Sequence, residues 1–182
     1  VVTTELVMVG YPPEDLVLKQ AFQDDAALAI RDLAADTEDG GPAIIVGVPW
    51  RVKGRLYNAA LLLADGKVSG EAYMFDLPNY GVFDEKRVFA AGRLPAPLAW
   101  RGYKLGVMVC EDMWSPIPAE ALAAAGAELH DAAAPAEFIL SEQLGLCPPG
   151  EAVALLRSGR TALGGDMPIN PSGGLISKGH PI

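Results

Sequence analysis

The hydrophobic positions near the N-terminus change from the period of a strand to that of a helix. Residues 1–6 are mostly apolar or β-branched, which predicts a strand, and Tyr11-Pro12-Pro13 predicts a turn after it. Helical spacing follows over about residues 13–36, and Gly40-Gly41-Pro42 ends it. The predicted apolar side of this helix consists of Leu16, Ala21, Leu28 and Leu33.

A continuous apolar run and a hairpin signal come next. Residues 43–50 (AIIVGVPW) form a short unbroken apolar stretch, typical of a strand that is buried on both faces. Residues 56–63 and 68–73 flank an Asp65-Gly66 pair, and this dipeptide favours a tight turn between two antiparallel strands. The pattern predicts three strands, of which the second and third form a hairpin.

The alternation of strand and helix continues to about residue 126. Residues 103–109 predict another apolar strand, and residues 117–125 predict an Ala-rich helix. A layered α/β sandwich is the natural architecture for this order of elements. Beyond this point Ala, Pro and Gly dominate, and helices are predicted at residues 135–143 and 149–157.

Composition and charge narrow the class of protein. The 182 residues are 51% hydrophobic and 20% charged, which is enough apolar material for a substantial core. The formal net charge is -9, so the mean electrostatic field repels phosphate backbones and we expect no nucleic-acid partner.

The two cysteines and the N-terminus indicate a reduced, cytoplasmic protein. Cys110 and Cys147 are far apart and neither belongs to a CxxC pair, so no disulfide framework or zinc site is predicted. The first residues lack the features of a signal peptide, and no apolar run is long enough to cross a membrane. Because the chain starts without Met inside a predicted strand, we interpret it as incomplete.

A candidate nucleophile lies at the end of the strand predicted at residues 103–109. Cys110 follows this strand directly and precedes two carboxylates, Glu111 and Asp112. A lone Cys on an apolar strand is more often a buried structural residue than a catalytic one. Its position alone therefore does not decide between the two roles.

Longer segments around Cys110 resemble a known family. Residues 10–19, 46–50, 56–59, 77–89 and 110–114 are similar, in order and spacing, to the glutaminase domain of glutamine-dependent NAD synthetases, which belong to the nitrilase superfamily. The resemblance covers residues 1 to about 127. It implies a partial four-layer αββα sandwich and hydrolysis of glutamine by a Glu, Lys and Cys triad.

The resemblance assigns roles to four residues. Cys110 matches the nucleophile and Glu5 the general base, whereas Tyr80 and Glu111 match positions near the bound glutamine. In such a site a thiolate attacks the side-chain amide while a carboxylate transfers the proton. ATP and deamido-NAD would bind a synthetase domain that this sequence lacks, so we expect no cofactor and no metal in this chain.

The catalytic Lys of the family has no counterpart in this sequence. Its position, three residues before the Leu of the Leu-Pro-Asn-Tyr motif, is occupied by Met74. A thioether supplies neither positive charge nor a hydrogen-bond donor for a developing oxyanion. Loss of one such electrostatic contact typically costs ~100-fold to 1,000-fold in rate, which predicts impaired glutaminase activity. Lys67, Lys86 and Lys104 are the candidates for a replacement.

The sequence after about residue 127 departs from the family. Residues from about 128 to 182 resemble the C-terminal part of a thiolase-like protein of the sterol-carrier type. His130 and His180 match histidines of that family, but its nucleophilic Cys has no counterpart and Cys147 lies in a Cys-Pro-Pro-Gly loop. Thiolase chemistry is therefore not expected.

Three functional hypotheses follow from these resemblances. The first is an impaired, ammonia-supplying glutaminase fragment at residues 1–127, followed by a short thiolase-like α/β segment at residues 128–182. The second is a catalytically inactive chimeric chain that acts as a folded binding or scaffold module, and the third is a thiolase-related acyl-CoA binder. The glutaminase fragment would leave strand edges unpaired, so we expect either the thiolase-like segment or a partner to cover them. A homo-oligomer and a poorly behaved monomer are both compatible with this expectation. We further predict a physical seam within residues 125–135.

Overall fold

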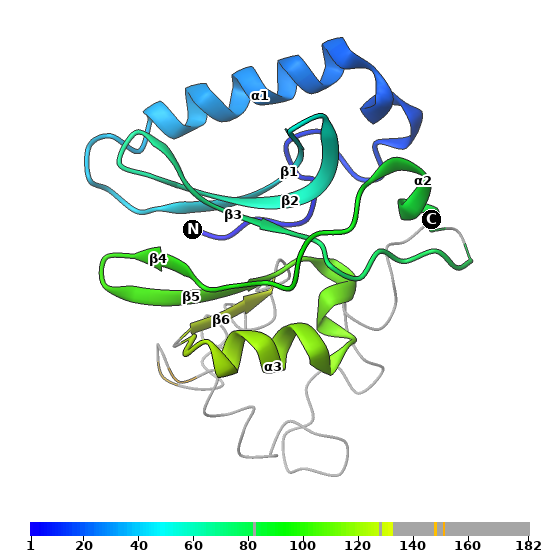
Figure 1. Ribbon diagram of the computed structural model, residues 1–182. Helices are drawn as coiled ribbons and strands as arrows, with labels where there is room; N and C mark the ends of the chain where they lie inside the picture. The colour runs from blue at the N-terminus through cyan, green and yellow to red at the C-terminus, as the bar shows by residue number, and fades with distance from the viewer. Residues whose placement is uncertain (82, 128, 133–147, 149–150, 152–182) are drawn as a thin grey trace. The chain divides into compact units, whose positions relative to one another are not determined.

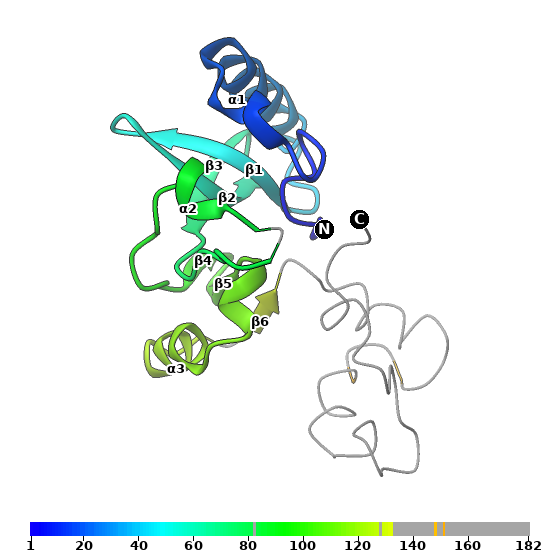
Figure 2. The ribbon, with the colours of Figure 1, turned by 90° about the vertical axis from the view of Figure 1, so that its right-hand side faces the viewer.

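The computed structural model describes residues 1–81, 83–127, 129–132, 148 and 151, and for residues 129–132 it describes the backbone. Figures 1 and 2 show the helices and strands of residues 1–132 in four layers, with a long helix, two sheets and a shorter helix stacked in turn. The predicted αββα sandwich is confirmed for this part of the chain.

Sheet A consists of β1 (Ile44–Val52), β2 (Arg55–Ala64) and β3 (Lys67–Tyr73), paired antiparallel in that order. The turn between β2 and β3 has φ values of 54° at Asp65 and 75° at Gly66, as a tight turn of the predicted kind requires. The hairpin prediction is confirmed. All three strands begin and end within two residues of their predicted positions.

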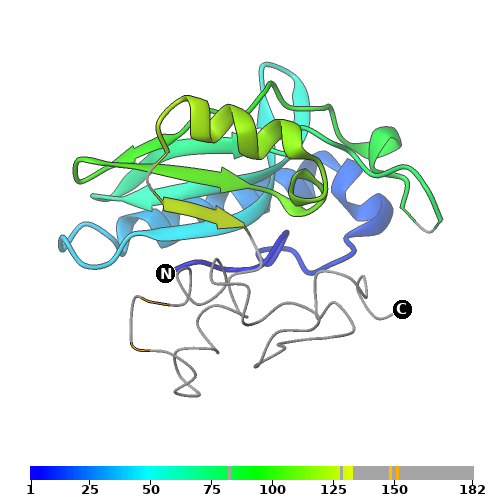
Figure 3. The same ribbon diagram turned by 90° about the horizontal axis from the view of Figure 1, so that it is seen from below.

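Sheet B consists of β4 (Leu98–Trp100), β5 (Tyr103–Met108) and β6 (Leu129–Ala132). The middle strand β5 pairs antiparallel with β4 and parallel with β6. Figure 3, which views the molecule from the side of sheet B, shows β6 running beside β5. The sequence predicted β5 but neither of its two short neighbours.

Helices cover the outer faces of the two sheets. The long helix α1 (Gln20–Ala35) lies on sheet A and α3 (Pro116–Ala124) lies beside β5. The Ser115 hydroxyl accepts a hydrogen bond from the Ile117 N–H at 3.4 Å, so α3 begins with a polar cap and Pro116 in its first turn. A one-turn helix, α2 (Glu85–Val88), lies in the connection between the sheets.

Two apolar cores hold these layers together. One lies between α1 and sheet A and the other between the two sheets, since alternate residues of β2 point to opposite faces. Leu61 and Leu63 belong to the first core, whereas Leu62 belongs to the second. The second core also contains Met74 and Val107, and Cys110 packs against it.

The helix predicted over residues 13–36 is wrong in its first part and in its buried side. Lys19 has an extended backbone (φ -77°, ψ 126°) and separates a 3-10 helix, Glu14–Leu18, from α1. The residues that α1 buries are Gln23, Ala26, Ile30 and Ala34. Three of the four predicted apolar residues, namely Leu16, Ala21 and Leu28, are exposed.

The strand predicted at residues 1–6 is also wrong. Only Val2 forms a β-bridge, which is parallel to Ile45 of β1, and the chain then turns. The turn passes directly over Gly47, where an added Cβ would lie 2.5 Å from both the Thr4 oxygen and the Leu6 nitrogen. The absence of a side chain at residue 47 is what allows the Glu5 segment to press against sheet A.

Internal contacts divide the chain into two units, Val1–Ala133 and Ala134–Ile182. Every helix and strand named above belongs to the first unit. The helices predicted at residues 135–143 and 149–157 lie outside the described residues. The division at residue 127 and the seam within residues 125–135 stay predictions.

Candidate active site

The candidate nucleophile lies just beyond the middle strand of sheet B. Cys110 is two residues past the end of β5 and opens a 3-10 helix, Cys110–Met113. Its φ of 46° is in the left-handed region that a non-Gly residue rarely adopts. Backbone strain of this kind is a feature of many active sites, because the surrounding structure must hold the residue in place.

The buried carboxylate of Asp112 fixes the position of the thiol. Its Oδ2 accepts the N–H of Val109 at 3.1 Å, and its Oδ1 accepts those of Phe75 and Asp76 at 2.9 Å each. These three bonds tie the end of β5 to the segment that follows Met74. Burial raises the pKa of Asp112 to about 6, although the three hydrogen bonds act in the opposite direction.

The predicted general base lies against the predicted nucleophile. Glu5 is 6% exposed and accepts a hydrogen bond from the Asn58 Nδ2 at 2.6 Å. Burial raises the pKa of the Cys110 thiol far above its ordinary value, and the charge of Glu5 and a hydrogen bond to Glu5 raise it further. Glu5 lies in a turn and not at the end of a strand, so that part of the prediction is wrong.

A second carboxylate, Glu85, joins this pair. Burial and then the charge of Glu5 raise the pKa of Glu85 to about 7, whereas the nearby Asn58 amide lowers it. Glu85 is therefore about half protonated at neutral pH. The thiol pKa of Cys110 is also raised by Glu85, which places all three groups within one electrostatic environment.

An aromatic hydroxyl belongs to the same environment. Burial is the largest cause that raises the pKa of Tyr11 above its ordinary value, and the charges of Glu5, Cys110 and Glu85 raise it further. The phenol therefore keeps its proton and remains a hydrogen-bond donor at neutral pH.

The two residues predicted to lie near the substrate form a pair at the surface. The Tyr80 hydroxyl donates to the Glu111 carboxylate, with both oxygens at 3.0 Å, and Tyr80 is 58% exposed. The ring of Phe83 packs edge-on against Tyr80 with 5.6 Å between centroids. Because Glu111 follows Cys110 directly, this pair lies next to the thiol on the solvent side.

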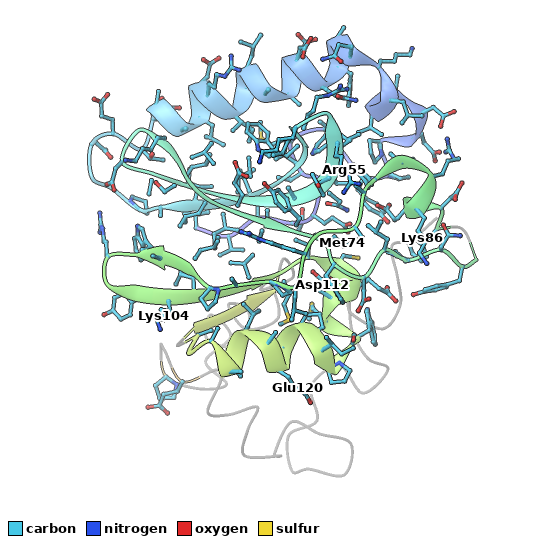
Figure 4. The ribbon with its side chains drawn as sticks, viewed as in Figure 1. Arg55, Met74, Lys86, Lys104, Asp112 and Glu120 are labelled. Carbon is cyan, nitrogen blue, oxygen red and sulfur yellow. The ribbon has the colours of Figure 1, made fainter. Side chains whose placement is uncertain are left out.

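Met74 occupies the buried side of the site. It is 1% exposed in the core between the sheets, and Figure 4 shows it next to the labelled Asp112. Lys86 is exposed on α2, and the Lys104 ammonium donates to the Ala125 carbonyl at 3.4 Å. Lys67 begins β3, whereas Met74 follows its end. Within the described residues, no charged group that shifts the Cys110 pKa is a cation.

Comparison with known proteins identifies the family. The sequence profile of the carbon-nitrogen hydrolases matches residues 1–145. The chain belongs to this family. The curated relatives include the glutamine-dependent NAD(+) synthetase of Rhodobacter capsulatus, 47% identical over 125 residues that are 69% of this chain and 22% of the relative. That of Thermotoga maritima is 36% identical over 126 residues, with the same coverage of 69% and 22%. The chain thus spans less than a quarter of the length of these carbon-nitrogen hydrolases.

Solved structures of carbon-nitrogen hydrolases agree. A glutamine-dependent NAD+ synthetase from Acinetobacter baumannii, in complex with adenosine diphosphate, is 32% identical with a TM-score of 0.65, covering 71% of this chain and 24% of that chain. An amidase variant from Nesterenkonia sp. AN1 is 29% identical with a TM-score of 0.58, covering 71% and 51%. Its structure shows Michael addition of acrylamide at the active-site cysteine.

A second profile matches the end of the chain. The family described as thiolase C-terminal domain-like matches residues 122–182, which overlaps the carbon-nitrogen hydrolase match over residues 122–145. The predicted thiolase-like resemblance is confirmed. The backbone of His130 lies in β6, but its side chain, Cys147 and His180 lie outside the described residues.

Sequence reasoning missed three of the residues that surround the thiol. Asn58, Glu85 and Asp112 occur in the segments that carry the family resemblance, but none was assigned a role. Their importance depends on distances across the fold, since Asn58 and Glu5 are 53 residues apart in the sequence. A buried Asn within an otherwise apolar strand was the one available signal, because such an amide requires hydrogen-bond partners.

Two further findings concern metal-binding groups and membrane-spanning helices. Among the described residues, no group of three or more His, Cys, Asp or Glu is arranged to hold a metal ion. None of the described helices is long and apolar enough to cross a membrane.

Proposed function

We propose that the carbon-nitrogen hydrolase portion of this chain is a glutaminase-type site that hydrolyses the side-chain amide of glutamine slowly. The observation that supports this proposal is the contact between Glu5 and the Cys110 thiol at the end of β5. The relatives named as glutamine-dependent NAD(+) synthetases support glutamine as the substrate.

The proposed reaction uses the two residues as nucleophile and base. The Cys110 sulfur attacks the carboxamide carbon of glutamine while its proton passes to Glu5. The tetrahedral intermediate then expels ammonia, which takes that proton, and leaves a thioester on Cys110. Water, deprotonated by Glu5, attacks the thioester and releases glutamate and the free thiol. Glu85 shares the environment of Glu5, so its partial protonation limits the negative charge that accumulates there.

The Tyr80 and Glu111 pair suits the amino-acid end of the substrate. An exposed carboxylate next to the nucleophile attracts an α-ammonium group, and the phenol orients that carboxylate through its hydrogen bond. Glutamine has its α-ammonium four bonds from the amide carbon, so one end can contact Glu111 while the other contacts Cys110.

Met74 explains why we propose slow hydrolysis. The charged groups of the described residues that shift the Cys110 pKa are acids, and each raises it. An attack that generates an oxyanion is then opposed by the local field. A Lys ammonium at position 74 would oppose that field and stabilise the developing oxyanion.

The longer relatives are named as NAD(+) synthetases, an activity that requires more than glutamine hydrolysis. We propose that ammonia made at this site would be passed to a synthetase portion that binds ATP and deamido-NAD, neither of which this chain is expected to hold. The chain alone is therefore expected to act only on glutamine.

The test is ammonia release from glutamine, measured with the parent chain, Met74→Lys and Cys110→Ala. We expect slow release by the parent, faster release by Met74→Lys and none by Cys110→Ala. The thiolase-like match supports an alternative, a catalytically inactive binding or scaffold module. Folded Met74→Lys protein that releases no ammonia above the Cys110→Ala level would contradict the glutaminase proposal and favour this alternative.

A further inference from the structure

The described part of the chain contains a pocket outside the candidate active site. It lies between β3 and residues 93–98 and has a volume of about 80 Å³. None of the residues that surround the Cys110 thiol lines it. A site for one water molecule needs about 10–15 Å³, so this pocket is large enough for a small organic molecule.

One side of the pocket is the outer edge of β3. The Met74 N–H continues the β2–β3 ladder by donating to the Asn58 carbonyl at 2.9 Å. Because backbone groups in an antiparallel pair alternate in direction, those of Glu71 and Tyr73 point away from β2 and toward the pocket. No described strand pairs with this edge of sheet A.

The other side is a segment that contacts β3 at both of its ends. A Cβ at Gly92 would lie 2.7 Å from the Tyr73 oxygen, so the close approach at this end requires glycine. At the other end Leu98 packs over Gly70 of β3. Between these ends the segment contains two prolines, which have no N–H to donate to the edge of β3. The segment therefore cannot close the pocket by pairing as a further strand.

A carboxylate in a fixed orientation lines the pocket. The Glu71 Oε1 accepts the Trp50 Nε1–H at 3.2 Å, and the Glu71 Oε2 accepts the Tyr73 hydroxyl. The Tyr73 ring is itself stacked on the Tyr57 ring, with 4.5 Å between centroids. A carboxylate has about four acceptor positions, so each Glu71 oxygen can accept one more donor.

Arg93 supplies the opposite charge. Burial and then the hydrogen bond to Glu71 raise the pKa of Tyr73, whereas the charge of Arg93 lowers it, so this guanidinium lies within electrostatic reach of the Tyr73 hydroxyl. Both ion pairs among the described residues belong to Arg87, so Arg93 and Glu71 line the pocket without pairing with each other. The pocket thus presents a cation and an anion that both have capacity for further hydrogen bonds.

We propose that this pocket binds a small zwitterion of the amino-acid class, with its carboxylate on Arg93 and its ammonium on Glu71. A guanidinium binds a carboxylate through two parallel hydrogen bonds, and an ammonium donates to the remaining acceptor positions of Glu71. A molecule with a single charge leaves one of the two pocket charges without a partner. A short unbranched chain suits a pocket of about 80 Å³. The inference does not depend on glutamine hydrolysis, because the pocket shares no residue with the proposed reaction.

The first experiment follows the Trp50 indole N–H by NMR in the full chain with ¹⁵N-labelled tryptophan. The sequence has three tryptophans, and Trp50→Phe assigns the signal of residue 50. The zwitterionic probe is β-alanine, whereas propionate and n-propylammonium have the same three-carbon chain with one charge each. We expect β-alanine to shift the Trp50 signal saturably, because its ammonium and the indole share Glu71. The two single-charge probes should bind at least about 10-fold more weakly. Equal dissociation constants for the three probes, or no saturable shift with β-alanine, would overturn the proposal.

Substitutions of exposed residues locate the binding. We expect Arg93→Gln and Glu71→Gln each to weaken the binding of β-alanine about 10-fold or more. The matched control is Lys53→Gln, because Lys53 is an exposed cation in the turn between β1 and β2, and it should leave binding unchanged. Arg93→Gln should release ammonia from glutamine at the parent rate, which distinguishes failure of this site from failure of the proposed glutaminase. Parent affinity for β-alanine in folded Arg93→Gln would contradict the proposal.

Discussion

The reactivity of Cys110 should depend strongly on the charge at position 74. In the parent chain, burial and the acids Glu5, Glu111 and Glu85 all raise the pKa of the thiol. Met74→Lys would introduce a cation opposite Asn58, whose amide contacts Glu5, and Glu5 in turn contacts the thiol. A cation within about 4–6 Å typically lowers the pKa of an acidic group by about one to three units.

The expected change in rate follows from two opposing effects. If the pKa of Cys110 falls by about two units, the fraction of thiolate near neutral pH rises about 100-fold. A less basic thiolate is also a weaker nucleophile. With a Brønsted coefficient of about 0.5, the rate constant of each thiolate falls about 10-fold. We therefore expect alkylation of Cys110 by iodoacetamide to accelerate about 10-fold in Met74→Lys.

The assay is best performed in a Cys147→Ser background, so that Cys110 is the single thiol, with intact mass measured against time at pH 7.5. Met8→Lys is a matched control, because Met8 packs against the core on the opposite face of sheet A. This control should alkylate at the parent rate. If Met74→Lys is folded by circular dichroism and also alkylates at the parent rate, residue 74 does not face the thiol and the argument from the lost Lys is mistaken.

Three other substitutions test separate parts of the site. The pKa of Glu85 is about 7 in the folded state, above its ordinary value of 4.5, so its contribution to stability is lost as pH rises through this range. In urea unfolding at pH 5 and 8, Glu85→Gln should remove roughly 1–2 kcal/mol of the pH dependence of the unfolding free energy, because solvent screens the partly exposed carboxyl. Asp112→Ala should lower the free energy of unfolding by about 3 kcal/mol in the same assay, because three N–H groups lose their acceptor. As a control, Asp25→Ala on the exposed side of α1 should change it by less than about 0.5 kcal/mol. Gly47→Ala should displace the Glu5 turn, since the new Cβ would lie 2.5 Å from backbone atoms, and tryptic digestion should then cleave after Lys19 sooner than in the parent.

The sequence predicted those elements whose signals are local. The Asp65-Gly66 pair favours a tight turn through backbone preference, and this turn connects β2 and β3. The short apolar run of β1 is typical of a buried strand in a layered fold. The short strands β4 and β6 have three and four residues, too few for any periodicity to be recognised. They exist because β5 lies between them.

The buried face of α1 illustrates why hydrophobicity alone was misleading. Sheet A supplies large side chains, so the helix above it contributes Ala26 and Ala34 while Leu28 remains exposed. Gln23 is buried because its Nε2 donates to the Val17 carbonyl at 2.6 Å and its Oε1 accepts from the Arg51 Nε at 2.6 Å. Neither bond could be predicted before the partners were known to be adjacent.

The candidate site was predictable as far as the family resemblance extended. Cys110, Glu5, Tyr80 and Glu111 came from matched motifs, and the structure brings them together in two contacting pairs. Their catalytic and binding roles stay predictions. The surrounding Asn58, Glu85 and Asp112 act through tertiary contacts, which a single sequence does not contain.

Covalent trapping by an electrophilic glutamine analogue, which carries a diazoketone in place of the carboxamide, is a direct test of the proposed glutaminase site. Intact mass and peptide mapping would follow the Cys147→Ser chain with and without Met74→Lys. We expect one adduct, on Cys110, that forms faster with Met74→Lys, is slowed by excess glutamine and is lost with Glu5→Gln. Folded Met74→Lys protein that forms no adduct, or an adduct that excess glutamine does not slow, would contradict the assignment of Cys110 and Glu5 to a glutaminase site.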